Sequence, residues 1–267
     1  MSGREAGLNI SDDPMCEGSE RAVQRMIMAT YILVHGGGMG GWVWKYIAAP
    51  LRSAGHIVHT PTLTGFGDRH HLISCDIDTA VHATDIARMM ECEEVWDAVL
   101  VVHSYAGAVA PLLLTMAGDR IRRVIYLDAI VPMAGESVAE AMGFLSAEAV
   151  VGLRAQHAAG QGPLGAGVPD QVRKMADIEP QRMSADRDAW VFRHLTDMPL
   201  SANICAIPVG ADAITHRVDY LGVPHTMMHP MHARADALGW TVHQLGGDRD
   251  HMVHVGDPDA VLTYLIE

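Results

Sequence analysis

Residues 98–117 read AVLVVHSYAGAVAPLLLTMA, and this stretch decides the fold. The segment Ala98 to His103 is almost uniformly apolar, which is typical of a strand buried on both faces of a sheet. Directly after it, Ser104 begins a helical pattern that runs to Ala117. A sharp turn from strand to helix lifts a serine hydroxyl out of the sheet, where it can act as a nucleophile. A serine that merely caps a buried helix is the alternative interpretation.

A run of glycines favours the nucleophile over the helix cap. His35, Gly36, Gly37 and Gly38 follow the first apolar stretch of the chain. Glycines in this position let backbone N–H groups approach a developing negative charge closely. A tight turn would explain a glycine cluster that stood alone, but not its combination with the turn at Ser104. The run is not a complete dinucleotide-binding fingerprint, because the required combination of G-x-G-x-x-G with an acidic residue some 20 positions on is absent.

The wider pattern alternates strands with helices, so the sequence predicts an α/β fold with a mostly parallel sheet covered by helices on both faces. A stretch of about 132–208 lacks strand patterning and predicts a small helical cap inserted into a domain of 29–267. Residues 1–28 contain no long apolar run and predict a flexible tail. The predicted strands lie at 30–35, 56–60, 98–103, 123–127, 225–229 and 241–245.

Composition excludes several classes of protein. The chain has 267 residues, 49% of them hydrophobic, which is enough for one large core. Its 32 acidic and 19 basic residues give a formal net charge of −13, which repels nucleic acid and anionic membranes. The four cysteines are scattered without a metal-binding or disulfide pattern, so we expect a cytoplasmic protein with reduced thiols.

A serine nucleophile needs a base within hydrogen-bond reach. Only His251 and His254 follow the last predicted strand, and His251 is nearer to the loop, so we favour it. His225, His229 and His232 could suggest a metal site. On a strand, however, His232 would face away from the other two, and no cysteine or acidic partner completes a zinc site. We therefore predict no metal.

Four segments resemble the bacterial esterase branch of the α/β-hydrolase superfamily, which is similar to plant methylesterases and hydroxynitrile lyases. The likeness covers about 29–140 closely and 219–267 more loosely. It implies that Ser104 is the nucleophile, that His251 is the base, and that the backbone N–H groups of Gly37 and Tyr105 form the oxyanion hole. The segments are PTLTGFGDRHHL (61–72), VLVVHSYAGAV (99–109), RVIYLDAIVPMAGES (123–137) and DHMVHVGDPDAVLTYL (250–265).

The catalytic acid departs from the pattern of this family. An aspartate usually follows the penultimate strand and orients the histidine, but 226–233 reads TMMHPMHA and contains no carboxylate. We prefer Asp128, because it follows the strand next to that of the nucleophile and faces the same edge of the sheet. The alternatives are Asp236, Asp248 and Asp250.

These roles predict a serine esterase that cleaves a small to medium apolar ester through an acyl-enzyme. We expect no cofactor, since side chains and backbone amides fill every chemical role, and the resemblance is compatible with a homodimer. One alternative is a lyase, cyclase or decarboxylase that uses Ser104 and His251 for proton transfer; another is an inactive ligand-binding protein. The expected substrate contacts are His35, Gly36, Gly38 and Met133, and further flexible apolar side chains in the cap are Met142, Met175, Met183 and Met198.

Overall fold

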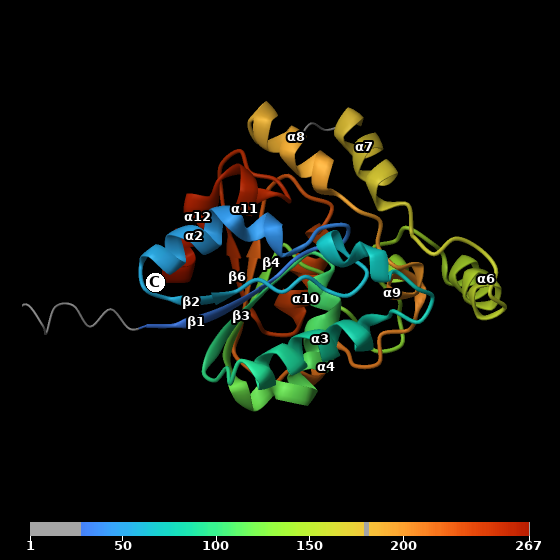
Figure 1. Ribbon diagram of the computed structural model, residues 1–267, viewed down its shortest axis with the longest axis horizontal. Helices are drawn as coiled ribbons and strands as arrows, with labels where there is room; N and C mark the ends of the chain where they lie inside the picture. The colour runs from blue at the N-terminus through green and yellow to red at the C-terminus, as the bar shows by residue number, and fades with distance from the viewer. Residues whose placement is uncertain (1–27, 179–181, 267) are drawn as a thin grey trace, which may run out of the picture.

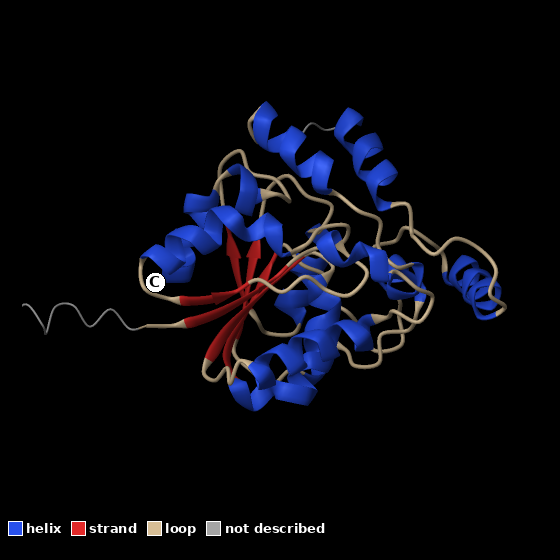
Figure 2. Cartoon of the chain, in the orientation of Figure 1, coloured by secondary structure: helices blue, strands red, loops and turns tan. Residues whose placement is uncertain are grey.

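The computed structural model describes residues 28–178 and 182–266, so the predicted tail lies outside the described residues except for Met28. A central sheet of six parallel strands has the order β2-β1-β3-β4-β5-β6 (Figure 2). The predicted fold class is therefore confirmed. The strands are β1 Thr30–Val34, β2 Ile57–His59, β3 Ala98–His103, β4 Ile121–Leu127, β5 Val218–Gly222 and β6 Thr241–Gln244.

Helices cover both faces of the sheet (Figure 1). On one face, α3 (Thr79–Cys92), α4 (Ala106–Ala117) and α10 (His229–Ala237) share a hydrophobic core with the strands. On the other face, a second core is formed with α2 (Lys45–Ser53), α11 (Val253–Gly256) and α12 (Pro258–Ile266). Because every strand runs in the same direction, the loops that follow the strands gather at one edge. The chain reverses its order between β1 and β3, and such a reversal is where open α/β sheets bind ligands.

One predicted strand is wrong. The segment 225–229 is not a strand; the fifth strand is instead β5, and 229–237 forms helix α10. Pro224 cannot donate a ladder hydrogen bond, and Pro230 stands in the first turn of α10, where a missing N–H costs nothing. The other five predicted strands match observed ones to within two residues at each end.

Between β4 and β5 the described residues form helices rather than sheet strands. We call these five helices the cap helices, and in Figure 1 α7 and α8 lie above the edge of the sheet while α6 lies to one side. No helix in the described part of the chain is long and apolar enough to cross a membrane. The cap helices are α5 Val138–Ala141, α6 Ala147–Ala158, α7 Val168–Ile178, α8 Ala185–His194 and α9 Leu200–Ile204.

Candidate active site

Ser104 stands on a strained turn between β3 and α4. Its φ angle is +54°, in the left-handed region of backbone conformation that residues other than glycine rarely adopt. The turn is possible because Gly107 has no side chain: a Cβ there would lie 2.2 Å from the carbonyl oxygen of Ile130. Ser104 keeps partial solvent exposure, whereas the residues from Ala98 to Pro111 on either side of it are buried. Within 98–111, Ser104 is therefore the one residue that reaches solvent, and it does so where β3 ends.

The glycine run after β1 lies against this turn. A Cβ on Gly36 would lie 2.8 Å from the Cβ of Ser104, so only glycine allows the two segments to approach so closely. Gly37 is the partly exposed member of the run. Within residues 28–178 and 182–266, the backbone N–H groups of Gly37 and Tyr105 are paired with no protein acceptor. Two adjacent segments therefore offer unpaired N–H donors beside Ser104.

Gly38 and Gly36, which are predicted to contact substrate, also have a packing role. Gly38 is buried, its carbonyl oxygen accepts a hydrogen bond from the N–H of Thr196 at 2.9 Å, and a Cβ on it would lie 2.7 Å from the side chain of Val168. Gly36 is buried as well. The outer glycines therefore pack the loop against the turn and against the cap segment, and Gly37 is left to face the solvent.

Asp128 and His251 are joined by a hydrogen bond across 123 positions of sequence. Nδ1 of His251 lies 2.7 Å from Oδ2 of Asp128, which follows β4 and is fully buried. An ionised carboxylate only accepts hydrogen bonds, so Nδ1 carries the hydrogen and donates it. The free lone pair of the imidazole is then on Nε2, the atom that a general base would use.

Two further donors hold the Asp128 carboxylate. The Thr226 hydroxyl donates to Oδ2 at 2.6 Å, and Nε2 of His232 donates to Oδ1 at 3.2 Å. Burial by itself would raise the pKa of Asp128, but the hydrogen bonds from His232, His251 and Thr226 outweigh it and lower the pKa to about 2. The group is therefore a carboxylate throughout the physiological pH range.

His103 fixes the loop that carries His251. It is fully buried, directly precedes Ser104, and donates from Nε2 to the backbone carbonyl oxygen of His251 at 2.9 Å. The rings of His103 and His251 also lie in contact, with their centroids 4.6 Å apart. The residue next to Ser104 thus positions both the backbone and the ring of His251.

A second set of contacts holds the turn from the other side. The Tyr105 hydroxyl donates to Nδ1 of His82 at 2.7 Å, and Nε2 of His82 donates to the carbonyl oxygen of Thr64 at 2.9 Å. His35 accepts a hydrogen bond from the N–H of Leu63 at 3.0 Å and contacts the carbonyl oxygen of Gly36 at 2.8 Å. His35 has no exposed surface, so it braces the loop and the prediction that it contacts substrate does not fit its position.

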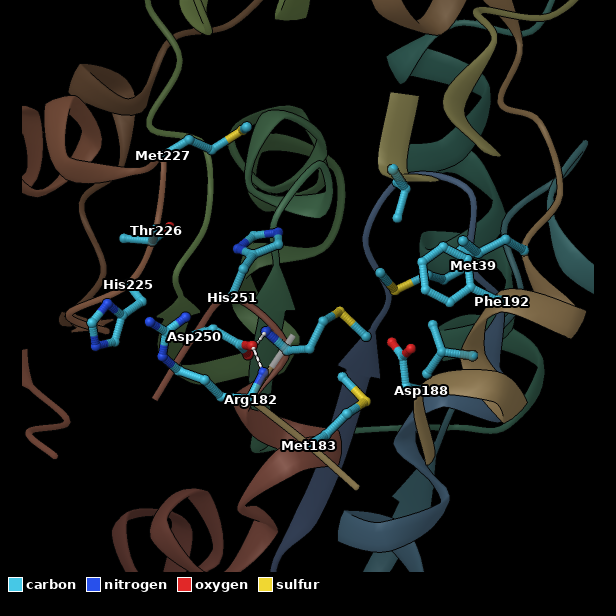
Figure 3. Close-up of a pocket in the computed structure, with 14 residues that line it drawn as sticks. Met39, Arg182, Met183, Asp188, Phe192, His225, Thr226, Met227, Asp250 and His251 are labelled. Carbon is cyan, nitrogen blue, oxygen red and sulfur yellow. Dashed lines mark hydrogen bonds between the residues drawn. The ribbon is translucent and has the colours of Figure 1, made fainter. Parts of the chain in front are cut away.

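A cavity of about 300 Å³ lies between α8 and the loops after β5 and β6, and His251 is in its wall (Figure 3). This is within the size range of small-molecule sites. Apolar side chains predominate in the lining, which does not include Ser104. The lining residues are Met39, Val172, Arg182, Met183, Asp188, Val191, Phe192, Leu195, His225, Thr226, Met227, Asp250, His251 and Met252.

The predicted methionines are distributed unevenly. Met183 lines the cavity, and the sulfur of buried Met198 lies 3.3 Å from a Cβ built on Gly37. Met142 packs against the core, and the side chain of Met175 is outside the described set. Met133 is 42% exposed and does not line the cavity, and its contact with substrate stays a prediction.

The alternative acids engage other groups. Asp250 accepts from the backbone N–H groups of Arg182 and Met252, and Asp248 pairs with Arg182 and His225. Asp236 is exposed. Asp128 is the carboxylate that the structure brings to His251. Sequence reasoning missed Thr226 and His232 because their contact with Asp128 spans about a hundred positions and depends on the loop and helix that replace the predicted strand.

Comparison with known proteins finds relatives that are named as esterases. The chain is 44% identical over 111 residues to the carbendazim hydrolyzing esterase of Nocardioides sp. (strain SG-4G), covering 42% of this chain and 46% of that protein. It is 32% identical over 110 residues to methylesterase 9 of Arabidopsis thaliana, covering 39% of this chain and 41% of that protein. The matched segments thus span less than half the length of either relative.

Solved structures share the whole fold. An extracellular alpha/beta-hydrolase from a Paenibacillus species superposes with a TM-score of 0.67 at 19% identity, over 89% of this chain and 98% of that one. The model of the alpha/beta hydrolase family matches residues 31–263. The predicted likeness to the esterase branch is confirmed, and the chain belongs to the alpha/beta hydrolase family.

Proposed function

We propose that the protein is a carboxylic ester hydrolase that works through an acyl-enzyme on Ser104. The observation that carries the proposal is the hydrogen bond of 2.7 Å between Asp128 and His251, in a loop that His103 ties to the strained turn at Ser104. Esterase names among the relatives support the same reaction. No role in this scheme requires a group other than side chains and backbone amides.

The first step is attack on the ester carbonyl. The Ser104 hydroxyl oxygen forms a bond to the carbonyl carbon while Nε2 of His251 takes the hydroxyl proton. Asp128 keeps the hydrogen on Nδ1, so that the basic lone pair is on Nε2, and its negative charge stabilises the imidazolium that forms. The low pKa of Asp128 keeps it ionised during this step.

The negative charge on the carbonyl oxygen then needs donors. We assign this role to the N–H groups of Gly37 and Tyr105, which have no protein acceptor among the described residues. Donors that are fixed in advance cost no reorganisation when the charge develops, and one such donor is worth about 100-fold to 1000-fold in kcat. The hydrogen bond from Tyr105 to His82 holds the turn in place for this purpose.

Breakdown of the intermediate completes the acylation. The bond to the alcohol breaks, and His251 returns its proton to the leaving oxygen. Water then attacks the acyl-enzyme, His251 takes a proton from the water, and the acid leaves as Ser104 recovers its hydrogen. The sum is ester plus water giving acid plus alcohol.

The cavity suits a small, mainly apolar substrate. Its volume of about 300 Å³ and its lining of methionine, valine, leucine and phenylalanine favour compact groups of adaptable shape. A relative is named for hydrolysis of carbendazim. We therefore propose carbendazim as a substrate to test beside simple aryl esters.

A fluorophosphonate tests the proposal, because it forms a covalent bond with activated serines. We expect one adduct per chain, located by peptide mass on Ser104. The adduct should be absent in H251A and form much more slowly in D128N. The exposed His71 gives a matched control, and H71A should label like the wild type.

A folded wild-type protein that takes up no label would refute the activated serine. A label on another residue would refute the assignment to Ser104. Turnover of an aryl ester that continues in S104A would show that hydrolysis proceeds by another route.

A further inference from the structure

Asp188 projects from α8 into the apolar cavity that His251 also lines (Figure 3). Its Oδ1 is buried, and within the described residues it has no hydrogen-bond partner. The neighbouring walls are apolar, formed by Met183, Val191 and Phe192 among others. Asp188 as a whole is half-buried, but a carboxylate oxygen in such surroundings is costly unless something pairs with it, because that oxygen has lost hydration without gaining a donor.

The charged groups around the cavity are engaged elsewhere. The guanidinium of Arg182 donates to Asp248 at 2.5 Å, and in Figure 3 this side chain extends toward His225 and away from Asp188. The guanidinium of Arg187 donates to the carbonyl oxygens of Val255 and Gly256. Neither arginine neutralises Asp188.

The other carboxylate in the cavity wall differs from Asp188. Asp250 accepts hydrogen bonds from the backbone N–H groups of Arg182 and Met252, so both of its oxygens are used. Burial raises the pKa of Asp188, and the negative charge of Asp250 raises it further. A positive charge in the cavity would relieve both effects at once.

We propose that Asp188 is a specificity-determining residue that binds a positively charged, N–H-bearing nitrogen of the substrate. This inference rests on the proposed function, since it takes the cavity beside His251 to be the substrate pocket. An ammonium or amidinium group would donate to the unpaired oxygen, while the apolar walls pack against the rest of the molecule. The net charge of −13 would also draw cations toward the protein.

Benzylammonium and benzyl alcohol form a suitable pair of probes, because they have similar shape and differ in charge. Direct calorimetric titration at neutral pH and low salt measures their binding without requiring turnover. We expect wild type to bind benzylammonium about 10-fold or more tightly than benzyl alcohol. In D188N the preference should fall to about 2-fold or less, because the shape of the side chain is kept and the charge is lost.

The matched control is D186N. Asp186 lies in the first turn of the same helix but is exposed, so this variant changes the net charge equally without touching the cavity. We expect D186N to keep the wild-type preference. Equal binding of both probes by wild type would overturn the proposal, and so would a preference that survives in D188N or disappears in D186N.

The result can be separated from that of the proposed function. Fluorophosphonate labelling of Ser104 and turnover of a neutral aryl ester test the esterase proposal separately, and both should be close to wild type in D186N, whose substituted residue lies outside the cavity. If labelling fails in every variant, the esterase proposal fails whatever the probes do. If labelling succeeds while wild type does not prefer the cation, the role of Asp188 alone is refuted.

Discussion

The carboxylate at the edge of the sheet, Asp128, and the carboxylate in the cap cavity, Asp188, have opposite surroundings. At the edge of the sheet, the Asp128 carboxylate has three side-chain donors. In the cavity, methionines and other apolar side chains surround a carboxylate, Asp188, with an unpaired oxygen.

This difference between the two carboxylates matches two roles, proton transfer at the edge of the sheet and substrate binding in the cavity. A proton transfer needs groups held within a few tenths of an ångström, so satisfied hydrogen bonds and packed rings favour it. A pocket that accepts a substrate needs groups whose partners arrive with the ligand. Changes at the edge of the sheet should therefore reduce kcat, while changes in the cavity should alter which molecule binds.

The largest effect is expected from removing the nucleophile or the base. S104A and H251A should each lower kcat for an aryl ester by about 10,000-fold to 1,000,000-fold, because these residues act as one unit. The double variant should be no worse than the singles by more than about 10-fold. Steady-state kinetics with circular dichroism to check folding measures this. Independent, additive losses would contradict a shared mechanism.

The second largest effect is expected from removing the charge of Asp128, the carboxylate that orients His251. D128N should lower kcat by about 10,000-fold, because an amide lets His251 adopt the wrong tautomer. D236N, at an exposed position, should stay within about 2-fold of wild type. Comparable activity of D128N and D236N would mean that Asp128 does not orient the base.

Acid should destabilise the buried side of the site. Burial lowers the pKa of His35 and of His82 to about 4 and of His254 to about 3, and lowers that of His103 well below its usual value. Between those values and 6.5 the unfolded chain binds more protons, so stability is complete above pH 6.5 and falls as the pH decreases. At pH 5 each histidine should cost roughly 2 kcal/mol of unfolding free energy.

Denaturant titrations at pH 7.5 and pH 5 measure this loss. The free energy of unfolding should differ less between the two pH values in H82Q than in wild type. In H71Q, at an exposed site, the difference should equal that of wild type. A wild-type protein that is equally stable at both pH values would argue against neutral, buried histidines.

The smallest effect is expected for the outer support of Asp128. T226V removes one of three side-chain donors to that carboxylate, so kcat should fall by roughly 10-fold, the equivalent of one hydrogen bond to a charged group. KM should change little, and the fluorophosphonate should still label Ser104 slowly. A change confined to KM would assign Thr226 to binding.

The sequence pattern predicts those parts of the fold that depend on residues close together in the chain. Strand β3 and the turn at Ser104 were predictable because an apolar run, a serine and small residues follow each other directly. The segment 225–229 has the local pattern of a strand, but Pro224 and Pro230 flank it, and the chain enters helix α10 at His229. Local pattern does not reveal strand β5, because this strand contains a charged residue, Asp219, which forms an ion pair of 2.6 Å with Arg123.

The candidate catalytic residues could be predicted from the sequence, but the residues that hold them in position could not. Asp128 could be selected from its place after the strand next to β3, since parallel strands end at one edge. The contacts of His232, Thr226 and His103 could not, because each joins segments about a hundred or more positions apart. Whether an oxygen of Asp188 is unpaired depends on where the cap helices lie over the sheet, and the hydrophobic periodicity of the sequence does not predict that position.

The most direct test of the central claim is to trap the intermediate. Wild-type protein is mixed with 4-nitrophenyl acetate, quenched in acid within the first turnover, and digested for peptide mass. We predict one acetyl group on the peptide that contains Ser104, formed together with a burst of nitrophenol close to one per active site. Steady release of nitrophenol with no burst and no acetylated peptide would contradict an acyl-enzyme on Ser104.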